Sequence, residues 1–139
     1  MLIEQAKNKR EAIVAILFAE KLPVDDLPEM LDNFLVATEG EQLIGVIGLE
    51  IYGGYGLLRS LAVLSEYRNK GVAGLLIRHL EKNAGLKELY LLTETAPEYF
   101  AGKGFQKVTR DEVPDEVKMS SEFSNVCPVS AIAMKKSIN

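Results

Sequence analysis

A long apolar run followed by a glycine-rich turn, LLRSLAVLSEYRNKGVAG at residues 57–74, constrains the fold more than any other stretch. The run is too uniformly apolar for a strand with one face in water, so it predicts a central buried strand. The turn and its small residues predict the start of a helix that a ligand can approach closely. Because the first N–H groups of a helix lack intrahelical partners, and Arg68 and Lys70 lie beside them, the stretch predicts a phosphate or pyrophosphate site.

Length and composition indicate one globular domain over residues 1–139, large enough to bury a core. The net charge of −4 argues against a general nucleic-acid binder. The single cysteine, Cys127, cannot form an internal disulfide, which fits a reducing cytosol. No apolar run reaches the roughly 18 residues of a membrane span, and the N-terminus lacks the order of a signal peptide. We therefore expect a cytoplasmic protein without a membrane, nucleic-acid or metal partner.

The pattern along the chain predicts an α/β fold with a mixed central sheet and helices on both faces. Asn8 and Glu11 resemble a capping box at the start of the first helix. The expected strands are 1–6, 33–38, 42–52, the central strand from 57, 86–93, 104–110 and 130–136, and the expected helices are 8–21, 25–31, 71–85, 95–103 and 114–123. Ligands of such sheets bind beyond the carboxyl ends of the strands, where residues 68–74 lie.

The turn resembles the acyl-CoA signature of the GCN5-related N-acetyltransferases (the GNAT family), R-x-x-G-x-[GA] after L-x-V. These residues are Leu61 to Val63 and Arg68 to Ala73. The likeness covers nearly the whole chain and implies acetyl-CoA as co-substrate, with the pantetheine arm on the strand backbone and pyrophosphate at the helix start. The cofactor-binding residues that it implies are Ala62, Val63, Arg68, Asn69, Lys70, Gly71, Val72, Ala73 and Gly74.

A second family signature, A-x-x-x-Y followed by Gly-Phe, is matched with one departure. Ala96 and Gly104-Phe105 agree with it, but Phe100 stands in the tyrosine position and Tyr99 lies one place earlier. That tyrosine often protonates the departing CoA thiolate, so the resemblance implies Tyr99, or water, as the acid.

Further stretches are similar to small GNAT proteins associated with arsenic resistance. They are residues 58–63, 91–96, 114–123 and 127–131, and a similar tail closes domains that make N-acetylglutamate. This likeness implies a small amine acceptor of amino-acid type.

Transfer to an amine is helped by a base, because deprotonating an amine of pKa about 10 at pH 7 costs roughly 4 kcal/mol. Glu50 and Glu94 end strands near the predicted active edge, and we favour Glu50 over Glu94; each is also readable as a solvated carboxylate. His79 is the single histidine, and its place on the apolar side of a helix predicts a structural role.

Arg59 and Ser60 interrupt the apolar central strand, where an unpaired charge is costly. Arg59 is expected to meet either an acceptor carboxylate or an internal acid. Ser60, Ser120 and Glu122 complete the predicted acceptor site. Three functions stay open: an N-acetyltransferase of a small amine, an acyl-CoA sensor without turnover, and a protein N-acetyltransferase. A homodimer is also left open.

Overall fold

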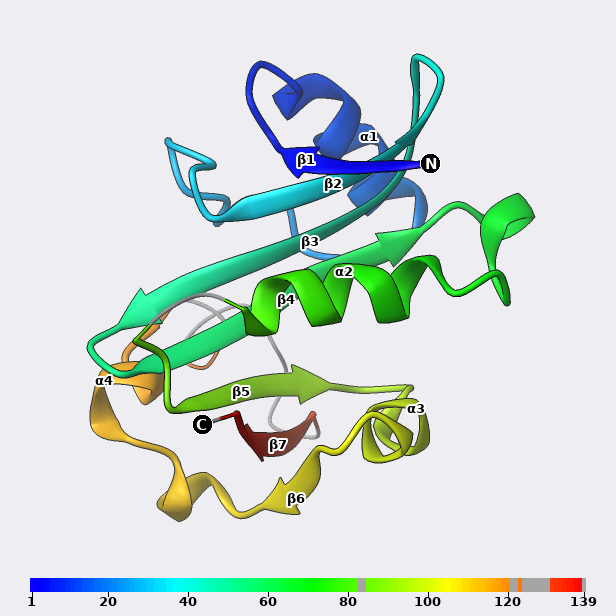
Figure 1. Ribbon diagram of the computed structural model, residues 1–139. Coiled ribbons are helices and arrows are strands. Elements are labelled where there is room, and N and C mark those ends of the chain that lie inside the picture. The colour runs from blue at the N-terminus through cyan, green and yellow to red at the C-terminus, as the bar shows by residue number, and fades with distance from the viewer. Residues whose placement is uncertain (83–84, 121–122, 124–130, 139) are drawn as a thin grey trace. The chain divides into compact units, whose positions relative to one another are not determined.

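The structure is a computed structural model that describes residues 1–82, 85–120, 123 and 131–138. Its elements are β1 Leu2–Gln5, α1 Arg10–Ala19, β2 Phe34–Glu39, β3 Gln42–Tyr52, β4 Tyr55–Val63, α2 Val72–Glu81, β5 Glu88–Thr93, α3 Pro97–Gly102, β6 Gln106–Val108, α4 Asp115–Lys118 and β7 Ile132–Ser137 (Figure 1). The strands join in one hydrogen-bonded sheet of order β1-β2-β3-β4-β5-β7-β6, with β4 parallel to β5. The predicted α/β class with a mixed sheet is confirmed.

Contacts divide the chain into two compact units. Unit 1 holds Met1–Leu49 and Arg59–Asn83, and unit 2 holds Glu50–Leu58 and Ala84–Asn139. Each unit is built from two separate stretches, so β3 and β4 each contribute residues to both. That the whole of residues 1–139 is one domain stays a prediction.

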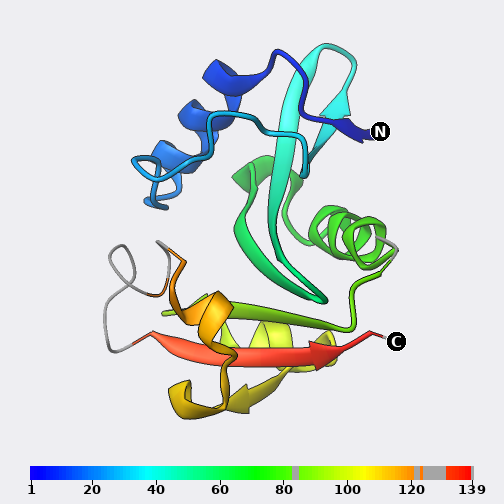
Figure 2. The ribbon, with the colours of Figure 1, turned by 90° about the vertical axis from the view of Figure 1, so that its left-hand side faces the viewer.

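In unit 1, α1 and α2 lie on opposite sides of the strands (Figure 2). The inner face of α1 buries Ile13, Ile16 and Leu17. They form a core with apolar side chains of the three neighbouring strands, Phe34, Val36, Val46 and Ala62. Burying three such side chains of α1 contributes about 5–9 kcal/mol by area transfer, which is enough to fix the helix on the sheet. The prediction of helices on both faces is therefore confirmed in this unit.

The hairpin of β2 and β3 explains two glycines that interrupt β3. Gly40, with φ 61°, makes the tight turn between the paired residues Glu39 and Gln42. A Cβ on Gly45 would lie 3.1 Å from the Val72 side chain of α2, and a Cβ on Gly48 would lie 2.5 Å from the Phe34 ring. The register also shifts between Ala37 and Thr38. Glycine within a strand is typical of a bulge or of a close packing contact, and the structure has a register shift opposite Gly45 and close contacts at both glycines.

In unit 2, β5 is the centre of the sheet. It pairs in parallel with the start of β4, from Tyr55↔Glu88 to Leu57↔Tyr90, and antiparallel with β7, which in turn pairs with β6. The apolar core on one face comprises Leu57, Tyr90, Val113, Val117, Phe123 and Ala133. This core holds the short helix α4 against the strands.

Two predicted helical features are wrong. Asn8 does not cap α1: the N-cap is Lys9, no side chain caps it, and Asn8 has a left-handed φ of 57° instead of an extended one. Residues 25–31 form turns and no helix. Arg10 of α1 donates hydrogen bonds to the carbonyl oxygens of Leu27, Pro28 and Glu29, so tertiary contacts satisfy groups that a helix would have paired internally.

Candidate cofactor and active site

The turn between β4 and α2 has the geometry of an anion site. Gly71, the N-cap of α2, has a left-handed φ of 82°, and a Cβ built on it would meet nothing within 4 Å. Over the described residues, no side chain caps the first turn of α2 and no acidic residue lies in it. The N-terminal N–H groups of this ten-residue helix and its dipole are thus available to an anion. The start of the helix at Gly71 is as predicted.

The basic residues of the turn differ in their contacts. Arg68 donates from Nε to the carbonyl oxygen of Val63 at 3.3 Å and forms an ion pair with Glu20 at the end of α1. Lys70 is exposed, and its Nζ lies 5.5 Å from the centre of the Tyr67 ring. Arg68 therefore ties the turn to β4 and α1, whereas Lys70 extends into solvent beside the helix start.

The middle of β4 carries a backbone irregularity that the sequence did not predict. Ser60 has a φ of 58°, which is uncommon for a residue with a side chain and costs about 1–3 kcal/mol when imposed. Adjacent side chains of a regular strand point to opposite faces, yet Nε of Arg59 donates to Oγ of Ser60 at 3.0 Å. The local bend of β4 thus brings both residues to one side, shortly before Ala62 and Val63.

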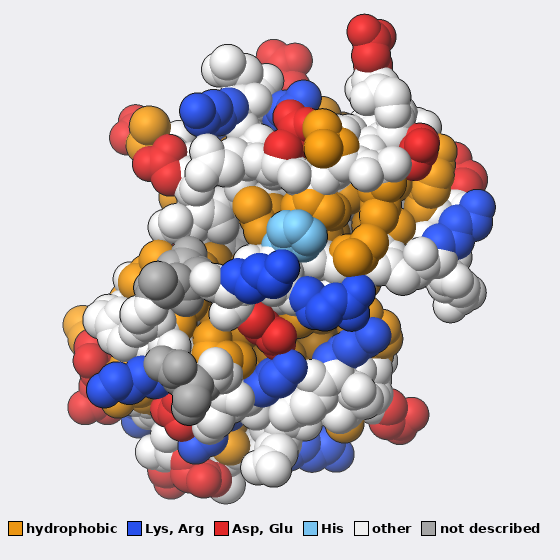
Figure 3. Space-filling model, in the orientation of Figure 1, with side chains coloured by type: hydrophobic (Ala, Val, Ile, Leu, Met, Phe, Trp, Pro, Cys, Tyr) orange, Lys and Arg blue, Asp and Glu red, His pale blue; other side chains and the backbone are white. Residues whose placement is uncertain are grey.

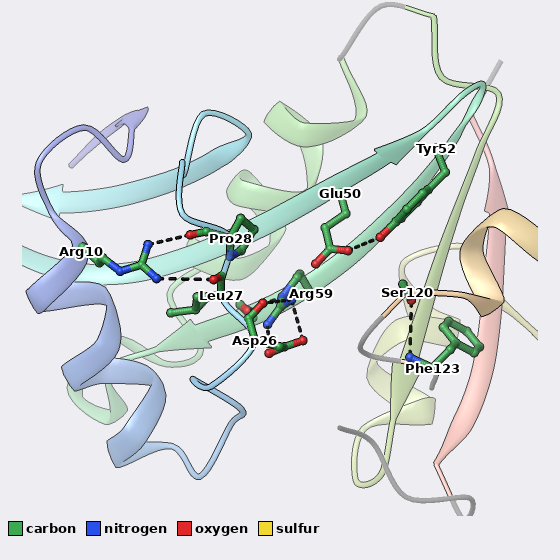
Figure 4. A network of polar contacts seen from close by, with 10 residues as sticks. Arg10, Asp26, Leu27, Pro28, Glu50, Tyr52, Arg59, Ser120 and Phe123 are labelled. Carbon is green, nitrogen blue, oxygen red and sulfur yellow. Dashed lines mark hydrogen bonds and ion pairs between the residues drawn. The ribbon is translucent and has the colours of Figure 1, made fainter. Parts of the chain in front are cut away.

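Arg59 forms a buried ion pair with Asp26 (Figure 4). Its two terminal nitrogens lie 2.7 and 2.9 Å from the two carboxylate oxygens, and the exposed fractions of the two side chains are 0% and 8%. Of the two roles expected for Arg59, this contact is the internal ion pair. A buried arginine in an apolar strand demands a buried acid, but the sequence offers no signal that selects Asp26 over its exposed neighbour Asp25.

The two carboxylates predicted as bases differ in their surroundings. Glu50, near the end of β3, is half-buried and accepts a hydrogen bond from the Tyr52 hydroxyl (Figure 4). The two residues are two apart on the strand, so their side chains share a face. Glu94, just after β5, is exposed. Glu50 is therefore held in place, as a positioned base would be. The exposure of Glu94 instead fits the alternative role of a solvated carboxylate.

Tyr99 and Phe100 are neighbours on α3, with ring centres 5.4 Å apart, but they differ in burial. Phe100 is 8% exposed, with its ring centre 5.8 Å from that of Phe105, so the family's tyrosine position belongs to the core of unit 2. Tyr99 is 40% exposed, and Nζ of Lys103 lies 5.5 Å from its ring centre. Partial burial raises the pKa of Tyr99, so its hydroxyl keeps its proton at neutral pH.

The remaining predicted residues have structural contacts or lie outside the described residues. Ser120 is buried and its Oγ accepts from the N–H of Phe123 at 3.4 Å (Figure 4). Glu122 and Cys127 lie outside the described residues. The prediction that His79 packs inward is wrong: it is exposed on α2 (pale blue in Figure 3), with Nδ1 2.9 Å from the Leu75 carbonyl oxygen.

The described residues lack two further features. Among them, no group of three or more His, Cys, Asp or Glu side chains is arranged to hold a metal ion. None of their helices is long and apolar enough to cross a membrane.

Sequence comparison finds acetyltransferases. Residues 31–107 match the model of the acetyltransferase (GNAT) domain. An uncharacterized N-acetyltransferase of Chlorobaculum tepidum is 31% identical over 101 residues, which are 70% of this chain and 64% of the relative. An uncharacterized N-acetyltransferase of Bacillus subtilis is 27% identical over 103 residues, 69% of this chain and 74% of the relative.

Structure comparison finds the same fold. The N-acetylglutamate synthase of Neisseria gonorrhoeae, solved with coenzyme A and N-acetylglutamate, has a TM-score of 0.81 at 20% identity, over 99% of this chain and 35% of that one. An aminoglycoside 6′-N-acetyltransferase solved with coenzyme A has a TM-score of 0.72 at 18% identity, over 100% and 98% of the two chains. The chain thus spans about a third of the synthase and 64% of the Chlorobaculum relative. With its fold and its glycine-rich turn, the chain belongs to the GNAT acetyltransferase family.

Proposed function

We propose that this chain is an acetyl-CoA-dependent N-acetyltransferase that acts by direct transfer to the amine of a small acceptor. The observation that carries the proposal is the start of α2, where left-handed Gly71 leaves open space over uncapped helix N–H groups with Lys70 beside them. A pyrophosphate needs this combination of close backbone approach and positive potential. The structure of the turn therefore fits the cofactor that the family uses.

The residues at the turn and on β4 would bind different parts of acetyl-CoA. Backbone N–H groups of Val72, Ala73 and Gly74, with Lys70 and Asn69, would hold the pyrophosphate. Arg68 would keep the turn in place through its bond to the Val63 carbonyl oxygen. The backbone of Ala62 and Val63 would receive the pantetheine arm. Acetyl-CoA supplies an acetyl group activated as a thioester.

Two protons must move during the transfer. The acceptor nitrogen bonds to the acetyl carbon and loses one proton, while the C–S bond breaks and the sulfur gains one. We propose Glu50 as the base, because the Tyr52 hydroxyl holds its carboxylate in one orientation. We propose Tyr99 as the acid, because its partly exposed hydroxyl can carry a proton to the sulfur, whereas Phe100 is buried and has no proton to give.

The acceptor is proposed to be amino-acid-like, as in the arsenic-resistance-associated members that the sequence resembles. The N-acetylglutamate synthase of the same fold supports this class, whereas the aminoglycoside acetyltransferase shows that the fold alone does not select it. Ser60, Ser120 and Glu122 stay the residues proposed for the acceptor site, and Arg59, which is paired with Asp26, is proposed to shape that site through its hydrogen bond to Ser60. A cytoplasmic location is part of the same proposal. So is a homodimer, which sedimentation can test.

A screen of amines tests the proposal, with the release of CoA thiol from acetyl-CoA as readout. Amino acids, aminoglycosides and peptides with free N-termini or lysines form its three arms. Saturable thiol release with an amino acid is expected. Calorimetric binding of CoA without thiol release in any arm would instead support a sensor, the function that the buried Phe100 favours. Turnover confined to peptides would make the chain a protein acetyltransferase.

A further inference from the structure

The segment around Asp26 is bound to two elements of unit 1 by arginines. Arg59 of β4 contacts it through both carboxylate oxygens of Asp26 and, at 3.4 Å, through the Asp26 carbonyl oxygen. Arg10 of α1 donates to the carbonyl oxygens of Leu27 at 3.4 Å, Pro28 at 2.6 Å and Glu29 at 3.3 Å. Figure 4 shows the contacts of Arg59 with Asp26 and those of Arg10 with Leu27 and Pro28. Four consecutive residues without helix or strand structure are therefore fixed by six hydrogen bonds to two arginines.

The pair with Asp26 also fixes the direction in which Arg59 points. A guanidinium is planar, so two contacts to one carboxylate set the plane of the whole group, including Nε. That Nε donates to Oγ of Ser60 at 3.0 Å. Both members of the pair are buried, and a buried charge keeps its geometry because leaving its partner is costly. The position of the Asp26 carboxylate thus sets the orientation of the Arg59 guanidinium, and through it the hydrogen bond to the Ser60 side chain.

Ser60 holds an unusual backbone conformation at a sensitive point of β4. A non-glycine residue at φ 58° persists only where its surroundings over-determine it. Its side chain bond to Arg59 is one such constraint. Ala62 and Val63 follow two and three residues later, so their backbone direction depends on the bend at Ser60.

From these contacts we infer that Asp26 is a positioning residue for acetyl transfer. It orients Arg59, which orients Ser60 and, through it, the β4 backbone that would hold the pantetheine arm at Ala62 and Val63. The inference rests on the proposed function, because this backbone matters to turnover only if the arm lies along it. It assigns Asp26 no contact with the substrates.

The expected effect falls on the rate and spares the affinity for CoA. Pyrophosphate binding is proposed at residues 68–74, whose described contacts do not include Asp26. The reacting end of the cofactor depends on the bend of β4, and a displacement of about 1 Å at a reacting centre costs about 10²-fold in rate. A change at Asp26 should therefore lower kcat and leave KM for acetyl-CoA nearly unchanged.

The test compares Asp26→Asn with Asp25→Asn, which changes the same charge at an exposed neighbour. Asp26→Asn keeps the size of the side chain but replaces one acceptor oxygen with a donor that repels the guanidinium. We expect kcat to fall about 10- to 100-fold in this variant, with KM for acetyl-CoA and Kd for CoA changed by less than about threefold. Asp25→Asn should match the wild-type protein in all three quantities.

Two further measurements separate positioning from a general loss of structure. In Asp26→Ala, formate can occupy the space of the missing carboxylate, and we expect it to restore about tenfold or more of the lost kcat, whereas chloride does not. Nuclear magnetic resonance should show shifted amide signals for Ser60, Ala62 and Val63 in Asp26→Asn and unshifted signals in Asp25→Asn. Assays are made well below the melting temperature of each variant.

Two results would overturn the inference. Wild-type kcat in Asp26→Asn, with a lowered melting temperature only, would make the ion pair purely structural while the proposed function stands. CoA binding by the wild-type protein without thiol release from any amine would remove the proposed function, and the positioning role would fall with it. The two failures are distinguished by the wild-type assay alone.

Discussion

Nε of Arg68 lies 3.3 Å from the carbonyl oxygen of Val63, so the first residue of the glycine-rich turn is bonded to the last residue of β4. The same guanidinium pairs with Glu20 at the end of α1. An arginine that a motif suggests as a direct phosphate ligand therefore has a second task, which is to hold the turn in the conformation that presents the N–H groups of α2. We therefore expect the affinity for an anion to depend chiefly on those N–H groups and on Lys70.

Gly71→Asp should abolish tight binding of CoA. The new carboxylate would lie at the start of α2, where it repels pyrophosphate and takes up the N–H groups that the anion needs. We expect Kd for CoA, measured by calorimetry, to rise by at least about tenfold, which is about 1.4 kcal/mol. An undiminished affinity for CoA would remove the basis of the proposed function.

Gly40→Asp is the matched control for this variant. Gly40 also has a positive φ, 61°, with nothing within 4 Å of its Cβ, but it lies in the β2–β3 turn. Both variants should lose about 1–2 kcal/mol of folding free energy from the left-handed backbone. Only Gly71→Asp should lose affinity for CoA.

The elements that local patterns specify were predictable from the sequence. The apolar run of β4, the turn at Gly71 and the hairpin through Gly40 depend on hydrophobic periodicity and on glycine, which act over a few residues. These elements agree with the structure closely. The anion site is predicted from the same local features, because it would be made from one turn and one helix start, and it stays a prediction.

Features that depend on distant partners were not predictable. The pattern of residues 25–31 suits a helix, but hydrogen bonds from Arg10 and Arg59 hold the segment in turns. The left-handed Ser60 likewise depends on a side chain that is fixed by a residue 33 positions away from Arg59. The prediction for His79 was wrong because the buried face of α2 contains Leu76, Ile77 and Leu80 but not His79. Tertiary contacts outweigh local propensity at each of these sites.

Tyr99→Phe should lower kcat by roughly 10²-fold if Tyr99 is the acid, because general acid catalysis contributes about that factor. Burial raises the pKa of Tyr99, so the wild-type protein should not lose activity through this group between pH 7 and about 9.5, below the usual tyrosine pKa. The rates are measured as CoA thiol release at saturating acetyl-CoA. Unchanged turnover with intact CoA binding would make Tyr99 structural.

Phe100→Tyr tests whether a hydroxyl at position 100 can replace the one at position 99 as the acid. It restores the family's residue, but at a buried site where an unpaired hydroxyl costs about 1–3 kcal/mol. We expect the double variant Tyr99→Phe, Phe100→Tyr to stay as slow as Tyr99→Phe. Recovery of the wild-type rate in the double variant would assign the acid to position 100 instead.

Glu88 should make the folding stability of unit 2 dependent on acid pH. Burial acts to raise the pKa of Glu88, but hydrogen bonds from Tyr90 at 3.0 Å and Lys135 at 3.2 Å outweigh it and hold the pKa below its usual value. A lowered folded-state pKa gives stability that is present above the unfolded pKa, about 4.3, and is lost as pH falls through the folded value. Urea midpoints between pH 5 and 3 should therefore fall less steeply in Glu88→Gln than in the wild-type protein, and Glu94→Gln, at an exposed site, should follow the wild type.

Arg59→Met tests the two roles of Arg59 against each other. Removing one member of a buried ion pair costs about 3–5 kcal/mol, because Asp26 is left charged and unpaired by Arg59, whereas an apolar pair of similar volume is often neutral. Arg59→Met should thus be strongly destabilised in urea unfolding, and the double variant Arg59→Met, Asp26→Leu should regain more than half of the loss. Activity should fall equally toward carboxylated and neutral amines. A loss confined to carboxylated amines would place Arg59 in the acceptor site and would mean that Asp26 gives up the guanidinium when the acceptor binds.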